Sequence, residues 1–179
     1  MSRIGRMPIA VPAGVTAEID GNKIKITGPK GTLTREIDPC ITMKLENGEI
    51  VLTRSSEDKD VKAKHGLYRA LIANMVKGVN EGYTKSLTVN GVGYKLTKTG
   101  NKIVMNLGLS HSVTVEEVPG ITLEVNGNNE ILVKGADNEL VGQVAAKIRD
   151  IRKVEPYHAY GIRYTDEVVI RKVSKTGKK

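Results

Sequence analysis

The sequence lacks several features that would place it in a familiar class of protein. Its 179 residues contain one cysteine, Cys40, and neither tryptophan nor phenylalanine. A single cysteine excludes an internal disulfide framework and is typical of a reducing compartment. The longest apolar run is the four residues 70–73, whereas a membrane helix needs about 20, and no secretory hydrophobic region follows Met1. We therefore expect a cytoplasmic protein that does not contact a membrane; an organellar copy without a presequence is the alternative.

The residue patterns of catalysis and of metal binding are also missing. The three histidines stand apart from one another and from any cysteine at metal-ligand spacing: His65, His111 and His158. Ser110 precedes His111 directly, but neighbours on a strand point to opposite faces, so they do not form a nucleophile and its base. We expect no metal, no cofactor, no small-molecule substrate and no enzymatic activity.

Basic residues are in excess, and they gather at one end of the chain. The formal net charge is +8, and residues 145–179 supply +6 of it, with 10 basic and 4 acidic side chains. Such a block is typical of a site for a polyanion. The alternative is a terminus that only keeps the protein soluble.

Short alternating segments separated by glycine turns dominate the first half. Turns at Asp20-Gly21 and Asn47-Gly48 favour hairpins, because these residues tolerate positive φ. The strands are predicted at residues 15–19, 23–27, 32–37, 41–45 and 49–53. An apolar stripe from Val61 to Val79 then predicts a helix, with a capping box from Ser55 to Asp58 and an end at Gly78 or Gly82.

The second half repeats this order. Strands are predicted at residues 87–90, 93–99, 102–107, 112–116, 121–125 and 130–134, and a helix opens near Asp137. The hairpin at 41–52 matches the one that starts at Ile121, an offset of 80 residues, and each leads into a helix. The expected fold is therefore α+β, with two similar modules, each an antiparallel sheet packed by one helix. We place the modules at 1–82 and 83–170, followed by a basic tail at 171–179.

The second module ends in a mixture of aromatic and basic side chains. Half of the six tyrosines lie here: Tyr157, Tyr160 and Tyr164. RNA binding uses this mixture, because cations pair with phosphates and planar groups stack on unpaired bases. Pro156 and Gly161 predict an irregular loop. The alternative is a surface loop whose tyrosines, Tyr164 above all, pack beneath the module.

These residues resemble a known family. Glu155-Pro156-Tyr157, Gly161-Ile162-Arg163-Tyr164 and Arg171-Lys172 are similar to the C-terminal motif of the bacterial large-subunit ribosomal protein six family. The resemblance extends over the whole chain through these further segments: Ser2–Ile9, Gly28–Gly31, His65–Leu71, Asn74–Val76, Gly91–Tyr94, Leu107-Gly108, Ser110-His111 and Val113.

The resemblance implies a structural constituent of the large ribosomal subunit with two duplicated α+β modules. It implies binding to large-subunit ribosomal RNA near the sarcin–ricin loop and the stalk base, where translational GTPases dock beside neighbouring ribosomal proteins. The RNA contacts that it implies are Pro156, Tyr157, Gly161, Arg163, Tyr164, Arg171, Lys172, Lys175, Lys178 and Lys179, with Ser2, Arg3, His65 and Arg69 in second rank; for His65 the alternative is a buried helix position. His158 and Tyr160 are further candidates from the residues of the same loop.

The chain departs from the family pattern within this motif. His158-Ala159-Tyr160-Gly161 stands where the family usually has Lys-Gly-Lys-Gly, and Val154 stands where proline is common. Two cations are therefore missing, and Tyr160 would stack where a lysine would pair. Two other functions stay open: a free-standing nucleic-acid chaperone, and a small hydrolase that uses Ser110 or His111.

Overall fold

The computed structural model describes residues 3–173 and Lys175. The chain divides into two compact units: the first comprises the residues up to Tyr83 together with Ala136–Asn138, and the second comprises Thr84–Gly135 and the described residues from Glu139 onward. Of the expected site residues, Ser2, Lys178 and Lys179 lie outside the described residues. No described helix is long and apolar enough to span a bilayer.

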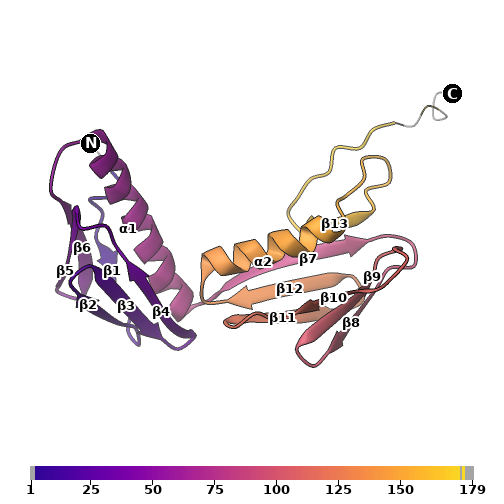
Figure 1. Ribbon diagram of the computed structural model, residues 1–179, viewed down its shortest axis with the longest axis horizontal. Coiled ribbons are helices and arrows are strands. Elements are labelled where there is room, and N and C mark those ends of the chain that lie inside the picture. The colour runs from indigo at the N-terminus through magenta and orange to yellow at the C-terminus, as the bar shows by residue number, and fades with distance from the viewer. Residues whose placement is uncertain (1–2, 174, 176–179) are drawn as a thin grey trace. The chain divides into compact units, whose positions relative to one another are not determined.

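The first unit combines six strands with one long helix (Figure 1). Its elements are β1 (Ile9–Ala10), β2 (Thr16–Asp20), β3 (Lys23–Gly28), β4 (Gly31–Glu36), β5 (Ile41–Glu46), β6 (Glu49–Arg54) and α1 (Lys59–Asn80). The strands form two sheets in the orders β1-β6-β5 and β2-β3-β4. Ile24 and Ile26 of β3 are fully buried while Lys23 and Lys25 are exposed, which is the alternation that predicted the strand.

The second unit repeats this plan with a larger sheet. Its elements are β7 (Tyr83–Asn90), β8 (Lys95–Thr99), β9 (Lys102–Asn106), β10 (Val113–Glu116), β11 (Ile121–Asn126), β12 (Glu130–Gly135), α2 (Asn138–Ile151) and β13 (Gly161–Tyr164). The strands form sheets in the orders β10-β9-β8 and β11-β12-β7-β13. The apolar side of α2, which includes Val141, Val144 and Ile148, is buried.

The predicted fold class of two similar α+β modules is confirmed. The β5–β6 hairpin, with Ile41 opposite Arg54, precedes α1, just as the β11–β12 hairpin, with Ile121 opposite Gly135, precedes α2. One detail differs, because each unit contains two sheets rather than one. In the first unit both sheets contribute to one core, and α1 packs against strands of each.

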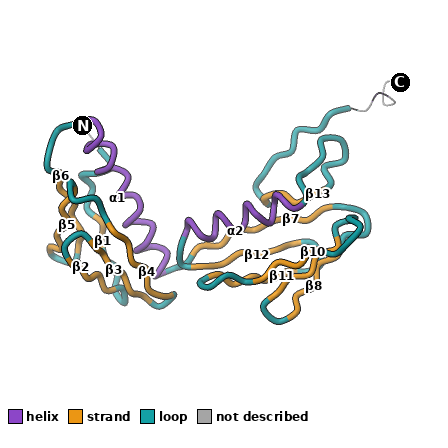
Figure 2. The backbone as a smooth tube through the Cα atoms, viewed as in Figure 1, coloured by secondary structure: helices purple, strands orange, loops and turns teal. Residues whose placement is uncertain are grey.

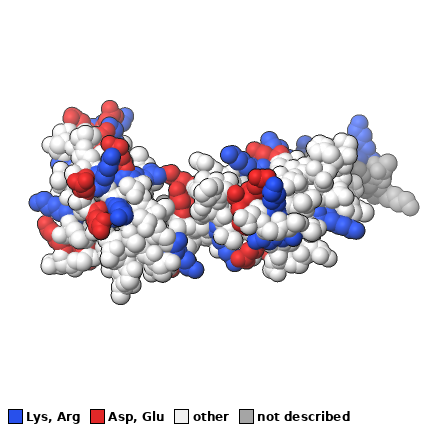
Figure 3. All heavy atoms as spheres, turned by 60° about the horizontal axis from the view of Figure 1, so that its bottom comes forward, with Lys and Arg blue, Asp and Glu red and all other residues white. Residues whose placement is uncertain are grey.

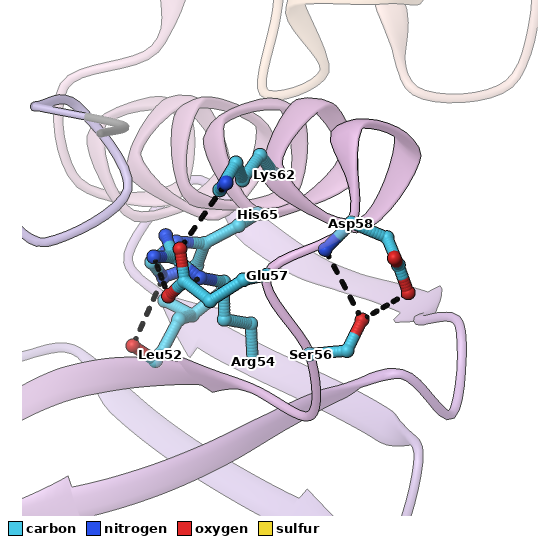
Figure 4. A network of polar contacts seen from close by, with 7 residues as sticks. All are labelled: Leu52, Arg54, Ser56, Glu57, Asp58, Lys62 and His65. Atoms are coloured by element: carbon cyan, nitrogen blue, oxygen red, sulfur yellow. Dashed lines mark hydrogen bonds and ion pairs between the residues drawn. The ribbon is translucent and has the colours of Figure 1, made fainter.

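The predicted capping box of α1 is wrong. The helix begins at Lys59 with Asp58 as its N-cap residue, and the Asp58 side chain makes no capping hydrogen bond. The Ser56 hydroxyl lies 2.6 Å from the Asp58 carboxylate, so the side chain at the N-cap position binds a serine instead of a helix amide (Figure 4). The helix passes through Gly78 and ends at Asn80, before Gly82 at φ +82°.

Replacing Gly28 with alanine is expected to lower the free energy of unfolding of the first unit by about 1–3 kcal/mol. A Cβ at Gly28 would lie 2.7 Å from the Val79 carbonyl oxygen, which already accepts a hydrogen bond of 2.9 Å from the Lys30 amide. Gly142→Ala is the control, because a Cβ there meets no atom outside its own helix backbone within 4 Å and alanine favours a helix by about 1 kcal/mol. Denaturant unfolding followed by circular dichroism measures both; an unchanged midpoint for Gly28→Ala would contradict the close packing.

Candidate nucleic-acid interface

Residues 155–160 lie between α2 and β13, and we call them the aromatic loop. Hydrogen bonds of Glu155 hold this loop closed. The Glu155 amide donates to the Tyr160 carbonyl at 3.0 Å. The Glu155 carboxylate accepts hydrogen bonds from the amides of Tyr157 (3.1 Å) and His158 (2.5 Å). One acidic side chain thus satisfies two backbone donors of a segment that lies outside the helices and strands.

Gly161 closes the base of the aromatic loop. Its φ is +138°, and a Cβ there would lie 2.7 Å from both the Lys153 carbonyl oxygen and the Val154 Cα atom. The next amide, that of Ile162, donates to the Arg152 carbonyl at 2.8 Å. Gly161 is therefore required by close backbone packing, and its expected contact with RNA stays a prediction. Ala159 also has a positive φ, of 61°, and is 4% exposed.

The rings of the aromatic loop face solvent. Tyr157 is 49% exposed and Tyr160 is 37% exposed. The His158 and Tyr160 rings stack, with centroids 5.4 Å apart and planes 18° apart. Pro156 is exposed as well. The loop thus presents flat rings to solvent at the positions where the sequence predicted RNA contacts.

Tyr164 and Arg163 are engaged within the protein. The Arg149 guanidinium lies 5.6 Å from the centroid of the Tyr164 ring and donates two hydrogen bonds, of 3.0 and 2.5 Å, to the Glu167 carboxylate. This pairing lowers the pKa of Glu167. Arg163 donates to the Glu167 carbonyl at 3.0 Å, and both Arg163 and Tyr164 are half-buried. These contacts support the packing alternative for Tyr164, and its expected contact with RNA stays a prediction.

The strand that carries these two residues is absent from the set of predicted strands, although alternating residues flank Tyr164 in the sequence. β13 pairs antiparallel with β7, with Gly161 opposite Asn90 and Tyr164 opposite Leu87. Arg149, which anchors both Glu167 and Tyr164 from α2, is likewise absent from the predicted site residues. The sequence signal for this strand was the alternation of the apolar Ile162 with the charged Arg163.

The C-terminal segment, residues 165–173 and Lys175, brings exposed cations to the aromatic loop. The Lys172 amide donates to the Pro156 carbonyl at 2.8 Å. The side chains of Arg171, Lys172 and Lys175 are exposed. The structure therefore joins two of the predicted groups, the tyrosines of the loop and the first cations of the tail. Figure 3 shows basic side chains reaching the end of the second unit from which this segment leaves.

In the first unit, His65 is a packing residue. It is 3% exposed, and its Nε2 atom lies 3.1 Å from the Leu52 carbonyl oxygen (Figure 4). A Cβ on Gly5 would lie 2.7 Å from the His65 Cγ atom, so the N-terminal segment covers the ring. His65 therefore takes the buried alternative, and we correct its assignment as an RNA contact.

The other two described residues of the second-rank set are placed differently. Arg69 is half-buried and donates to the carbonyls of Met7 (3.2 Å) and Pro8 (3.4 Å), so it fixes the segment that precedes β1. Arg3, near the start of that segment, is exposed. Contact with RNA stays a prediction for both.

Comparison with known proteins decides the family. A family model described as Ribosomal protein L6 matches residues 11–82 and 90–165. The large ribosomal subunit protein uL6 of Caldicellulosiruptor bescii is 54% identical over 178 residues, 99% of this chain and 98% of that protein. That of Lachnoclostridium phytofermentans is 53% identical over 180 residues, the full length of both. The chain belongs to the ribosomal protein L6 family.

Membership of the L6 family confirms the resemblance seen in the sequence. It makes the chain a structural constituent of the large ribosomal subunit rather than an enzyme, located in the cytoplasmic ribosome. The two stretches matched to the L6 model agree with the internal repeat.

The serine and histidine of the hydrolase alternative are not neighbours on a strand. Ser110 and His111 lie in the loop between β9 and β10 rather than on a strand, and the Ser110 hydroxyl is 3.4 Å from His111 Nδ1. Both side chains are exposed, and among the described residues no carboxylate is hydrogen-bonded to the ring. The described residues hold no cluster suited to a metal ion. The L6 family, rather than side-chain direction, excludes the hydrolase.

The backbone amides of the aromatic loop are expected to report the ionisation of Glu155. Burial raises the pKa of Glu155, but hydrogen bonds from the amides of His158 and Tyr157 lower it. Together the lowering effects are the larger, so the pKa lies below the ordinary 4.5. Because its pKa is lowered, the ionised Glu155 carboxylate stabilises the folded loop. This stabilisation is present above pH 4.5 and is lost as the pH falls through the lowered pKa. In an NMR titration, the amide signals of Tyr157 and His158 should move with a midpoint below 4.5.

Glu155→Gln is the control for this titration, because it removes the ionisable group and should abolish the transition. A midpoint at or above the ordinary 4.5 in the unaltered protein would contradict the closed geometry of the loop.

Proposed function

We propose that the chain binds large-subunit ribosomal RNA through the aromatic loop and the C-terminal segment, near the sarcin–ricin loop and the stalk base. The observation that carries this proposal is that Tyr157, His158 and Tyr160 face solvent on a loop that hydrogen bonds of Glu155 hold closed. A rigid platform of exposed rings loses little conformational entropy when unpaired bases stack on it.

The cations beside the rings complete the interface. Arg171, Lys172 and Lys175 are exposed on the segment that is hydrogen-bonded to the loop through the Lys172 amide. Each cation that neutralises a phosphate releases counterions and adds affinity. Rings for bases and cations for phosphates in one place favour single-stranded or irregular RNA over a regular duplex.

The contributions of the two modules are unequal in this proposal. The module at 83–170 with its tail at 171–179 contributes most of the affinity. The module at 1–82 adds weaker contacts from Arg3, which is exposed, and from Arg69, which holds the N-terminal segment in place. Neighbouring ribosomal proteins and the translational GTPases would then lie close to the bound chain.

Reconstitution of large subunits with and without the chain tests the proposed place. Chemical footprinting should show protection at or next to the sarcin–ricin loop only when the chain is present. The chain should also sediment with large subunits in stoichiometric amount in high salt, which a free-standing nucleic-acid chaperone would not do. Protection confined to a distant part of the RNA would contradict the proposal.

Replacing Tyr157 with alanine is expected to weaken binding to large-subunit RNA by about 1–3 kcal/mol, because a stacking platform is removed. The dependence of affinity on salt should stay the same, since no charge changes. Tyr157→Phe is the matched control, which keeps the ring and should bind nearly as well as the unaltered protein. Filter binding over a series of salt concentrations measures both, after circular dichroism has shown that each variant is folded.

Replacing both Arg171 and Lys172 with glutamine should change the dependence of affinity on salt, unlike the replacement of Tyr157. The slope of log affinity against log salt should fall in magnitude by about 1.4–1.8, at roughly 0.7–0.9 for each phosphate that no longer has a cation beside it. Lys102→Gln with Lys134→Gln is the control of equal charge, since these lysines pair with Glu116 and Glu124 on the second unit. If the two double variants show the same dependence of affinity on salt, Arg171 and Lys172 do not contact phosphates, and the tail only keeps the protein soluble.

A further inference from the structure

Two segments of the family pattern have no role in the interface described so far. They are the loop after β7, residues 91–94, and the loop after β9, residues 107–112. Tyr94 joins them: a Cβ on Gly91 would lie 2.6 Å from the Tyr94 Cδ2 atom, and one on Gly108 would lie 3.2 Å from the Tyr94 Cε1 atom. The ring is thus held between two glycines that come from different loops. We call this pair of loops, together with Lys95 and Asn106 at its base, the two-loop tip.

The strand register puts the two-loop tip at the same end of the second unit as the aromatic loop. Asn90, the last residue of β7, lies opposite Gly161, which directly follows the aromatic loop. Lys95 lies opposite Asn106, so the loops that adjoin β8 and β9 leave from one end of their sheet. Figure 2 shows these loops together at that end of the unit.

The surface of the tip is small, polar and open. Val92 is 82% exposed, and Lys95, Ser110 and His111 are exposed as well. Gly93 has a φ of +75°, and a Cβ there would meet no atom within 4 Å, so its backbone is accessible. Glycine at such a place permits close approach of another backbone. A lysine, a hydroxyl and an imidazole are groups that contact phosphate and ribose.

We propose that the two-loop tip is a second contact for the same RNA, which holds the ribose–phosphate backbone of the strand whose bases stack on the aromatic loop. In this arrangement Lys95 pairs with a phosphate, Ser110 and His111 contact backbone oxygens, and Val92 lies against a ribose. Tyr94 is a positioning residue that keeps the two loops in register. The inference rests on the proposed function, because it extends that interface along one strand.

The composition of the tip favours RNA over a protein partner. The centre of a protein interface is rich in apolar and aromatic side chains and poor in charged ones. Val92 is the one large apolar side chain that is exposed on the described tip. Lys95, Ser110 and His111 are hydrophilic, and no acidic residue occurs in residues 91–95 or 106–112.

Two variants of the full-length chain test the contact by different means. Val92→Asp puts an anion against the RNA backbone and should weaken binding to large-subunit RNA about five- to tenfold. Lys95→Gln should reduce the magnitude of the salt slope by about 0.7–0.9. The matched controls are Val118→Asp, in the turn between β10 and β11, and Lys102→Gln, at the opposite end of β9; both should bind within about twofold of the unaltered protein.

The outcomes separate this inference from the proposed function when Tyr157→Ala is measured alongside. Loss of affinity in Val92→Asp together with a lower slope in Lys95→Gln supports the contact. Normal binding by both tip variants, with weak binding by Tyr157→Ala, overturns the contact and leaves the proposed function standing. Normal binding by all three overturns both. Normal RNA affinity with poor incorporation of Val92→Asp into subunits would mean a protein partner at the tip, and it also overturns the inference.

Discussion

The close approach of Gly161 to the backbone of residues 153 and 154 is the constraint on which the binding surface depends. A Cβ at this position would lie 2.7 Å from the Lys153 carbonyl oxygen, and the adjacent Ile162 amide is bonded to Arg152. The chain can therefore leave α2, form a short loop and return directly into β13. Without this close backbone contact, the rings of the aromatic loop and the start of β13 would not be held in fixed positions.

The structure separates residues that build the surface from residues that the surface offers. Glu155, Arg149 and Glu167 hold the loop and the segment that follows β13 through hydrogen bonds to the backbone or to one another. Tyr157 and Arg171 are exposed. Charged and aromatic residues thus occur in both groups, and only their contacts tell the groups apart.

That distinction marks the limit of what the sequence could predict. The hairpins and both helices followed from local rules, because Asn47-Gly48 and the stripe from Val61 to Val79 act within a few residues. β13 did not, since a four-residue strand between a glycine and a turn is set by its pairing with β7, more than 70 residues earlier in the chain. His65 lay on the apolar stripe, so its burial was one of two interpretations, and the cover supplied by Gly5 decided between them.

The way in which the aromatic loop is built bears on how its chemistry can change over generations. Glu155, the loop backbone and Gly161 keep the loop closed, and the side chains at 157, 158 and 160 project from it. Ala159 adopts a left-handed conformation, with a φ of 61°, at a cost of about 1–2 kcal/mol. Scaffold and chemical contact are thus largely independent, so the side chains at 157, 158 and 160 can be exchanged without changing the hydrogen bonds that close the loop.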